Sequence, residues 1–189
     1  MGQLIINIVT NYYIDNTAIK NLFRYIAGEG KNKGKERLRF SSAKGLSFNY
    51  KEAALQLIIM QEILEKTAGR RVYHMVVSFP ENFKEDKDGR FIDLVAYSIA
   101  NVLFRDYQVF YGIHTSTDNI HIHFAFNAVS YRNGKKWHKS LAEFKEFKNE
   151  ILYIVNDTLV RYGYEKMTLK KYSREEEEKS KDYFTYKNL

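Results

Sequence analysis

Apolar residues recur along this chain with two different periods, and the periods predict its helices and strands. Continuous apolar runs rich in β-branched and aromatic residues are typical of buried strands. Apolar residues spaced three and four apart predict amphipathic helices. The expected strands cover residues 3–10, 70–79, 107–114 and 120–129. The expected helices cover residues 15–28, 50–67, 89–104 and 141–162.

Turn and cap residues delimit these elements and indicate how they connect. Asp15 or Asn16 can cap the first helix, which ends at Gly28. The last two strands are separated only by the turn-like residues 115–119, a spacing that predicts a hairpin. Strands separated by helices, together with one tight hairpin, predict an α/β (α+β) fold. We expect a central, mainly antiparallel sheet of about five strands, with helices packed on it in two or three layers.

The length and composition indicate one independently folding unit. A chain of 189 residues is long enough for one well-buried core and too short for two ordinary domains. We therefore expect residues 1–189 to form a single domain, with residues 165–189 as a charged helical or flexible tail. The chain has no cysteine, which excludes disulfides, thiolate metal sites and thiol nucleophiles. No apolar run approaches the ~20 residues that span a bilayer, so we expect a soluble, cytoplasmic protein with no membrane partner.

Positive charge is concentrated in one segment, and this distribution suggests a polyanionic partner. The net charge is +7, and between Lys20 and Lys44 there are eight Lys and Arg residues against two Glu. The glycine-rich residues 28–45 are expected to form a mobile, basic, DNA-gripping loop. The expected DNA-binding residues of this loop are Lys31, Lys33, Lys35, Arg37, Arg39 and Lys44. A second basic patch, beside the hairpin, comprises Arg132, Lys135, Lys136 and Lys139.

Three of the five histidines fall within ten residues, in the two strands of the expected hairpin. Side chains two apart on a strand point to the same face, so His121 and His123 project together. The hairpin can return His114 from the neighbouring strand to the same place. Asp118, in the turn, is placed to hold one imidazole through a hydrogen bond. The sequence therefore predicts that three imidazole rings converge.

Such a cluster could bind one divalent metal ion. Three nitrogen ligands leave coordination positions open, as in catalytic metal sites. The metal could polarise a carbonyl or phosphoryl oxygen, or activate water. Nitrogen ligands favour Mn²⁺, whereas Mg²⁺ prefers oxygen but is the more abundant ion. The other two histidines are expected outside the cluster, His74 as a packed strand residue and His138 in a loop near the nucleic acid.

Four segments together resemble the mobilization relaxases of the histidine-hydrophobic-histidine (HUH) endonuclease superfamily. Residues 114–127 resemble their third motif, in which a histidine, an acidic turn and an H-x-H strand build a metal site. Residues 127–138 are similar to its continuation, and YHMVVSF, ending at Phe79, resembles the second motif. Residues 18–31 are similar to the first motif, whose nucleophilic tyrosine lies near a helix end, here Tyr25. The resemblance spans residues 6–164.

The resemblance implies an HUH, palm-like fold and a metal-dependent endonuclease that nicks one strand of single-stranded DNA at a transfer origin. Tyr25 would attack a phosphodiester near the metal, giving a 5′-phosphotyrosyl link and a free 3′ hydroxyl that can reseal the strand. Tyr12 and Tyr13 are the alternative nucleophiles. The implied setting is a plasmid or an integrative and conjugative element, with accessory relaxosome proteins as partners.

Two other classes of function share some of these features. Rolling-circle replication initiators and transposases of the same superfamily use the same chemistry, but their nucleophile usually follows the H-x-H strand. A noncatalytic nucleic-acid-binding module could instead use zinc for structure. The upstream context of Tyr25 favours a relaxase.

Overall fold

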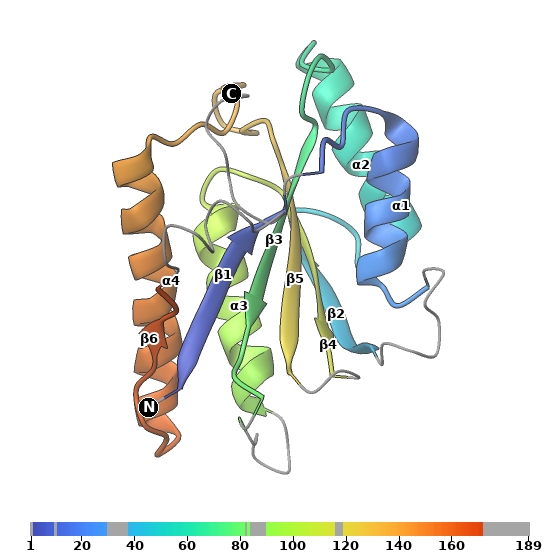
Figure 1. Ribbon diagram of the computed structural model, residues 1–189. Helices are drawn as coiled ribbons and strands as arrows, with labels where there is room; N and C mark the ends of the chain where they lie inside the picture. Colours follow the sequence, from blue (N-terminus) through green and yellow to red (C-terminus); the bar gives the residue numbers. More distant parts are fainter. Residues whose placement is uncertain are drawn as a thin grey trace.

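A six-stranded sheet forms the middle layer of the molecule in the computed structural model (Figure 1), in the order β2-β4-β5-β3-β1-β6. The structure describes residues 2–9, 11–29, 38–81, 83, 90–115 and 119–171. Neighbouring strands are antiparallel except for β1 and β6, which are parallel. The elements in chain order are β1 (Gln3–Ile8), α1 (Asn16–Ile26), β2 (Leu38–Lys44), α2 (Tyr50–Ile63), β3 (Val72–Ser78), α3 (Arg90–Phe104), β4 (Val109–His114), β5 (His121–Asn127), α4 (Leu141–Arg161) and β6 (Thr168–Leu169).

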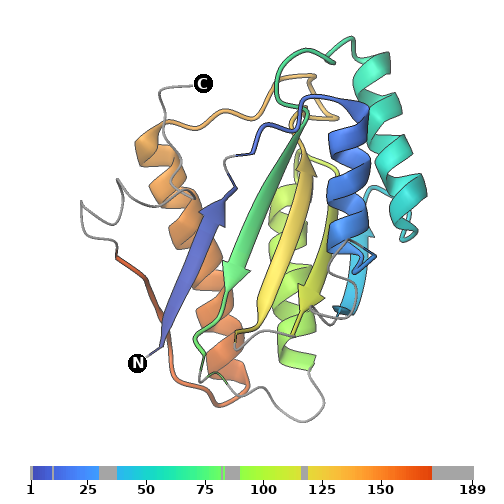
Figure 2. The ribbon, with the colours of Figure 1, turned by 45° about the vertical axis from the view of Figure 1, so that its right-hand side comes forward.

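Helices cover both faces of the sheet, so the fold has three layers (Figures 1 and 2). Helices α1 and α2 lie on one face, where their apolar side chains pack against Val72, Phe110 and Ala125. Helices α3 and α4 lie on the other, over the larger apolar core. The expectation of a mixed α/β fold with a mainly antiparallel sheet is confirmed. Among the described residues, no helix is long and apolar enough to cross a bilayer.

Two strands lie where the sequence predicted none. Residues 38–44, expected in a basic loop, form the edge strand β2, which pairs with β4. Only Ala43 of this strand is fully buried, so hydrogen bonds to β4 hold it rather than an apolar pattern that the sequence could reveal. The short strand β6 lies within the expected tail and pairs with β1, and Met167 just before it is buried. The tail prediction was therefore wrong for this segment.

Side-chain caps fix where the helices begin. The Asp15 side chain accepts a hydrogen bond from the Ala18 amide at 2.7 Å, as predicted for the start of α1. Ser140 and Glu143 form a reciprocal capping box at the start of α4. Helix α2 ends at Ile63, before the predicted end at residue 67, and the backbone at residue 65 then turns left-handed.

A buried polar network ties α1 and α2 to the end of β5. The Gln61 side chain, on α2, donates to Asn127 Oδ1 at 2.7 Å and to the Arg71 carbonyl at 2.5 Å. The Arg71 guanidinium donates to Gln61 and to Asn16 in the first turn of α1. Asn127 also donates to Gln108 at 3.0 Å. Because buried polar groups are costly unless paired, this network fixes the first turn of α1 relative to the sheet.

Candidate active site

The hairpin of β4 and β5 brings the three predicted histidines together on the sheet face that α1 covers. His114 lies directly opposite His121, and His123 lies opposite Gly112 on β4. Directly opposite residues share a face of the sheet, as do residues two apart on a strand. The ring centroids of His114 and His123 are 4.7 Å apart, and those of His121 and His123 are 6.1 Å apart. The structure therefore gathers these rings as the strand period predicted.

Helix α1 places Tyr25 against the same rings. The Tyr25 ring packs edge-on, with its centroid 5.5 Å from that of His114 and 5.3 Å from that of His123. Tyr25 is half-buried in the last turn of a helix whose inward side carries Ile19, Phe23 and other apolar residues. The predicted nucleophile thus packs against two of the three predicted metal ligands, His114 and His123, although they are about 90 residues apart in sequence.

Gly112 makes this close approach possible. A Cβ atom at Gly112 would clash with the Ile26 carbonyl oxygen and would lie 3.0 Å from Ile26 Cγ2. The end of α1 therefore rests on bare backbone in the middle of β4. The same Ile26 carbonyl oxygen lies 3.0 Å from His114 Nε2 and accepts its hydrogen bond. The residue that follows Tyr25 thus also orients one of the predicted ligands.

His74, which the sequence placed outside the cluster, is a member of it. Its ring centroid lies 5.2 Å from that of His123 and 6.2 Å from that of Tyr25. His74 Nε2 and His123 Nδ1 are 3.0 Å apart, at hydrogen-bond distance. The register of β3 against β5 sets Val76 opposite His123, which makes His74 the diagonal neighbour of His123. This long-range register could not be read from the sequence.

Burial keeps the inner histidines neutral. Burial is the largest cause that lowers the pKa of His74 to about 3, and repulsion from His114 adds to it. Burial also holds the pKa of His123 well below its usual range, with smaller contributions from the neighbouring histidines. Neutral imidazole is the form that binds metal ions. His121 is half-buried at the start of β5, at the same end of the hairpin as His114.

The donor set suits a divalent transition metal, but the rings do not all present donors to one point. In the described part of the chain, no group of three histidine or acidic side chains is arranged to hold a metal ion as it stands. Two ring nitrogens already have partners within the protein: His114 Nε2 faces the Ile26 carbonyl, and His123 Nδ1 faces His74. His123 would offer its Nε2 to a metal, because its Nδ1 faces His74. The residue types fit such an ion, because imidazole nitrogens are common ligands of transition metals.

The predicted basic loop is only partly described. Four of its residues lie outside the described part of the chain, namely Lys31, Lys33, Lys35 and Arg37. Asp118, in the turn between β4 and β5, also lies outside it. The other two residues of that loop turn toward α3, on the opposite face of the sheet from the histidines. There Arg39 lies 3.6 Å from the Asp93 carboxylate, and Lys44 lies 3.7 Å from the centre of the Tyr97 ring.

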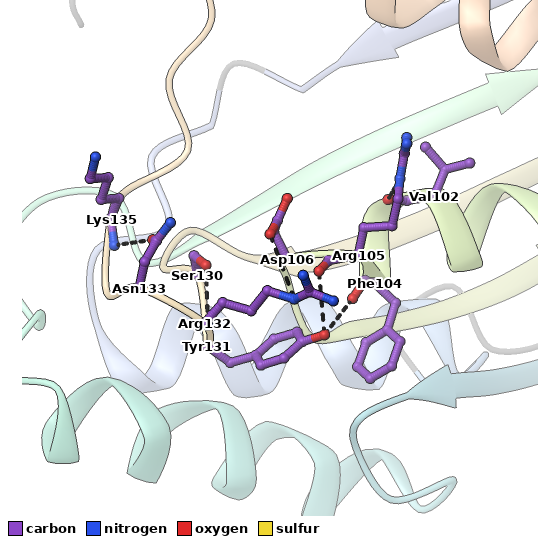
Figure 3. A network of polar contacts seen from close by, with 9 residues as sticks. All are labelled: Val102, Phe104, Arg105, Asp106, Ser130, Tyr131, Arg132, Asn133 and Lys135. Atoms are coloured by element: carbon purple, nitrogen blue, oxygen red, sulfur yellow. Dashed lines mark hydrogen bonds and ion pairs between the residues drawn. The ribbon is translucent and has the colours of Figure 1, made fainter.

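The second basic patch lies at the opposite end of β5 from His121 and His123, in the loop that leads to α4. The Arg132 Nε atom lies 3.9 Å from the Asp106 carboxylate. Figure 3 shows this pair, with Lys135 in the same turn as Arg132. Lys136 donates hydrogen bonds to the Ala68 and Arg70 carbonyls and so fastens this loop to the start of β3. The structure therefore does not bring this patch to the histidines.

The two alternative nucleophiles have different surroundings. The Tyr13 hydroxyl lies 3.2 Å from His74 Nδ1, on the side of that ring away from His123. Burial raises the pKa of Tyr13, which disfavours its phenolate. Tyr12 is about half exposed, and its ring lies 4.6 Å beneath the Arg70 guanidinium. Neither ring makes the contacts with His114 and His123 that Tyr25 makes.

Comparisons with known proteins agree with this architecture. The family model described as "Relaxase: MobA/VirD2-like, nuclease domain" matches residues 25–158. A solved structure described as "Molecular Basis of Vancomycin Resistance Transfer in Staphylococcus aureus" has a similar fold, with a TM-score of 0.54 and 14% identity. The similarity covers 91% of this chain and 100% of that chain. No curated protein matches the sequence.

Proposed function

The chain belongs to the MobA/VirD2-like relaxases, and from this premise we propose that it nicks single-stranded DNA at a transfer origin through Tyr25. As a relaxase of a mobile element it acts on DNA as an endonuclease. The main support for Tyr25 as the nucleophile is the contact of its ring with His114 and His123. No other described tyrosine has ring contacts with both of these histidines.

The proposed reaction is a transesterification. The Tyr25 hydroxyl loses its proton and attacks the phosphorus of one phosphodiester, and the bond to the 3′ oxygen breaks. The 3′ oxygen takes up a proton, which leaves a free 3′ hydroxyl and a 5′-phosphotyrosyl link. Because one phosphodiester replaces another, little free energy is lost and the same 3′ hydroxyl can reseal the strand.

The proposed reaction would use a divalent cation, as the resemblance to relaxases implies. We propose that His114, His121 and His123 hold it, with Mn²⁺ favoured by the nitrogen ligands and Mg²⁺ by its abundance. When bound, the cation would neutralise charge on the phosphate oxygens. The imidazole rings would supply lone pairs, and the Tyr25 ring packs edge-on against those of His114 and His123. Asp118 remains a proposed partner of these rings, and its placement lies outside the described residues.

Single-stranded DNA would be bound through its phosphates. We propose that Lys31, Lys33, Lys35 and Arg37 contribute to this binding because they flank the end of α1 in sequence, next to Tyr25. Arg39 and Lys44 could contribute only by leaving Asp93 and Tyr97. Arg132, Lys135 and Lys136 would contact DNA well away from the scissile phosphate, and accessory proteins at the origin remain part of the proposal.

A covalent trapping experiment tests the nucleophile. The protein is incubated with Mn²⁺ and a panel of labelled single-stranded oligonucleotides from candidate transfer origins, and a band that survives denaturant is sought. We expect Tyr25→Phe to remove the band and Tyr12→Phe to keep it, since Tyr12 lies apart from His114 and His123. Peptide mapping of the adduct identifies the tyrosine.

Each other outcome has a definite meaning. An adduct on a tyrosine downstream of β5 would replace the Tyr25 proposal with the mechanism of replication initiators or transposases. A Tyr25→Phe protein that still forms the adduct would refute the assignment. Binding of the oligonucleotides without any adduct would favour a noncatalytic module.

A further inference from the structure

A series of polar contacts joins Tyr13, His74 and His123 on the sheet face that α1 covers. The Tyr13 hydroxyl lies 3.2 Å from His74 Nδ1, and His74 Nε2 lies 3.0 Å from His123 Nδ1. Both nitrogens of His74 therefore have a partner within the protein. His74 and His123 are each only 6% exposed, so water competes little for these contacts. This series of contacts links the segment before α1, through β3, to the H-x-H strand β5.

This arrangement decides which nitrogen of His123 can serve as a ligand. A neutral imidazole has one N–H donor and one lone pair, and the partner of one nitrogen sets the role of the other. Because Nδ1 of His123 faces His74, Nε2 is the nitrogen left to bind a cation. A metal-bound His123 would then donate from Nδ1 to His74 Nε2, and His74 would donate from Nδ1 to the Tyr13 oxygen.

We propose that His74 is a positioning residue for His123 and that Tyr13 positions His74 in turn. This inference rests on the proposed function, because it takes His123 as a metal ligand. Metal-binding histidines usually donate their second N–H to a carboxylate, a backbone carbonyl or water. In this protein the buried imidazole of His74 would accept that hydrogen bond from His123. Tyr13, considered above as an alternative nucleophile, becomes a support for the site instead.

A role in packing alone makes a different prediction from a role in positioning. If His74 only fills space between α1 and the sheet, an apolar side chain of similar size would serve as well. If it orients His123, its loss should weaken metal binding even when the protein stays folded. Loss of such an outer partner typically weakens metal affinity by about 10- to 100-fold.

The test measures the Mn²⁺ dissociation constant by electron paramagnetic resonance of free Mn²⁺, without DNA. We expect His74→Leu to raise it by roughly 10- to 100-fold. His74→Gln, whose amide oxygen can still accept from His123, should recover part of the loss, and Tyr13→Phe should show a smaller loss. His138→Leu, which removes an exposed histidine away from the site, is the matched control and should bind as the wild type does. Circular dichroism and thermal melting check that each variant is folded.

A second measurement needs no metal. In protein labelled with ¹⁵N at histidine, a scalar coupling across the hydrogen bond should join His74 Nε2 and His123 Nδ1. Absence of this coupling in the folded protein would overturn the proposal. So would a folded His74→Leu protein that binds Mn²⁺ with the wild-type dissociation constant. If the wild type itself fails to bind Mn²⁺, the proposed use of metal fails, and the coupling alone then decides whether His74 holds the His123 ring.

Discussion

Replacing Gly112 by alanine should separate Tyr25 from the histidines without altering either. The added methyl group would meet the Ile26 backbone, with the Ile26 carbonyl carbon only 3.3 Å away. A backbone atom cannot swing aside as a flexible side chain can, so the end of α1 must lift. Restoring ordinary van der Waals contact requires a shift of roughly 1 Å.

The consequences of that shift can be estimated for both stability and rate. Overpacking of this kind costs about 1–3 kcal/mol of the free energy of unfolding. The hydrogen bond from His114 Nε2 to the Ile26 carbonyl, now 3.0 Å, would weaken as well. A misplacement of about 1 Å at a reacting group can cost on the order of 10²-fold in rate. We therefore expect Gly112→Ala to form the covalent DNA adduct about 100 times more slowly.

The assay compares the rate of adduct formation with the free energy of unfolding in urea. Gly134→Ala is the matched control, because Gly134 has a φ of 65° and nothing within 4 Å of an added Cβ. The left-handed backbone should cost that variant about 1–2 kcal/mol, while its distance from the histidines leaves the rate unchanged. If Gly112→Ala slows the reaction no more than Gly134→Ala does, the close contact of α1 with β4 does not position Tyr25.

Three further predictions concern pH, the buried network and DNA binding. Burial lowers the pKa of His74 from its ordinary value of 6.5 to about 3 in the folded protein. The unfolded chain therefore binds more protons between these values, and the free energy of unfolding should fall by about 1.4 kcal/mol per pH unit below pH ~6. Urea titrations of His74→Gln should show a flatter pH dependence, and an equal dependence would contradict the assignment. Asn127→Ala should lower the free energy of unfolding by about 1–3 kcal/mol, because it removes a hydrogen-bond partner from each of the buried side chains of Gln61 and Gln108. An unchanged urea midpoint would show that this polar network adds no stability. If Arg132 and Lys135 contact phosphates, replacing both with alanine should reduce the slope of log Kd against log salt by about one per residue, whereas an unchanged slope would remove them from the DNA-binding surface.

The local elements were predictable because each is set by neighbours in the chain. The apolar spacing of Ile19, Leu22, Phe23 and Ile26 gave α1, and all four are buried in the structure. The i, i+2 spacing of His121 and His123 placed both on one face of a strand. The edge strand β2 was missed because an edge strand needs no apolar pattern when its backbone pairs with a neighbour.

By itself, the sequence determined the four helices and the strands β1, β3, β4 and β5, but not β2 or β6. It also determined that His114, His121 and His123 meet across one hairpin. Hairpin pairing and side-chain alternation are local, so the spacing of residues is enough to decide them. Only the tertiary structure decided that β3 lies beside β5, which brings His74 to His123, and that α1 crosses β4 at Gly112, which brings Tyr25 to the histidines. Those contacts depend on the packing of elements far apart in the chain, where burial and close approach select one arrangement among many that the local patterns allow.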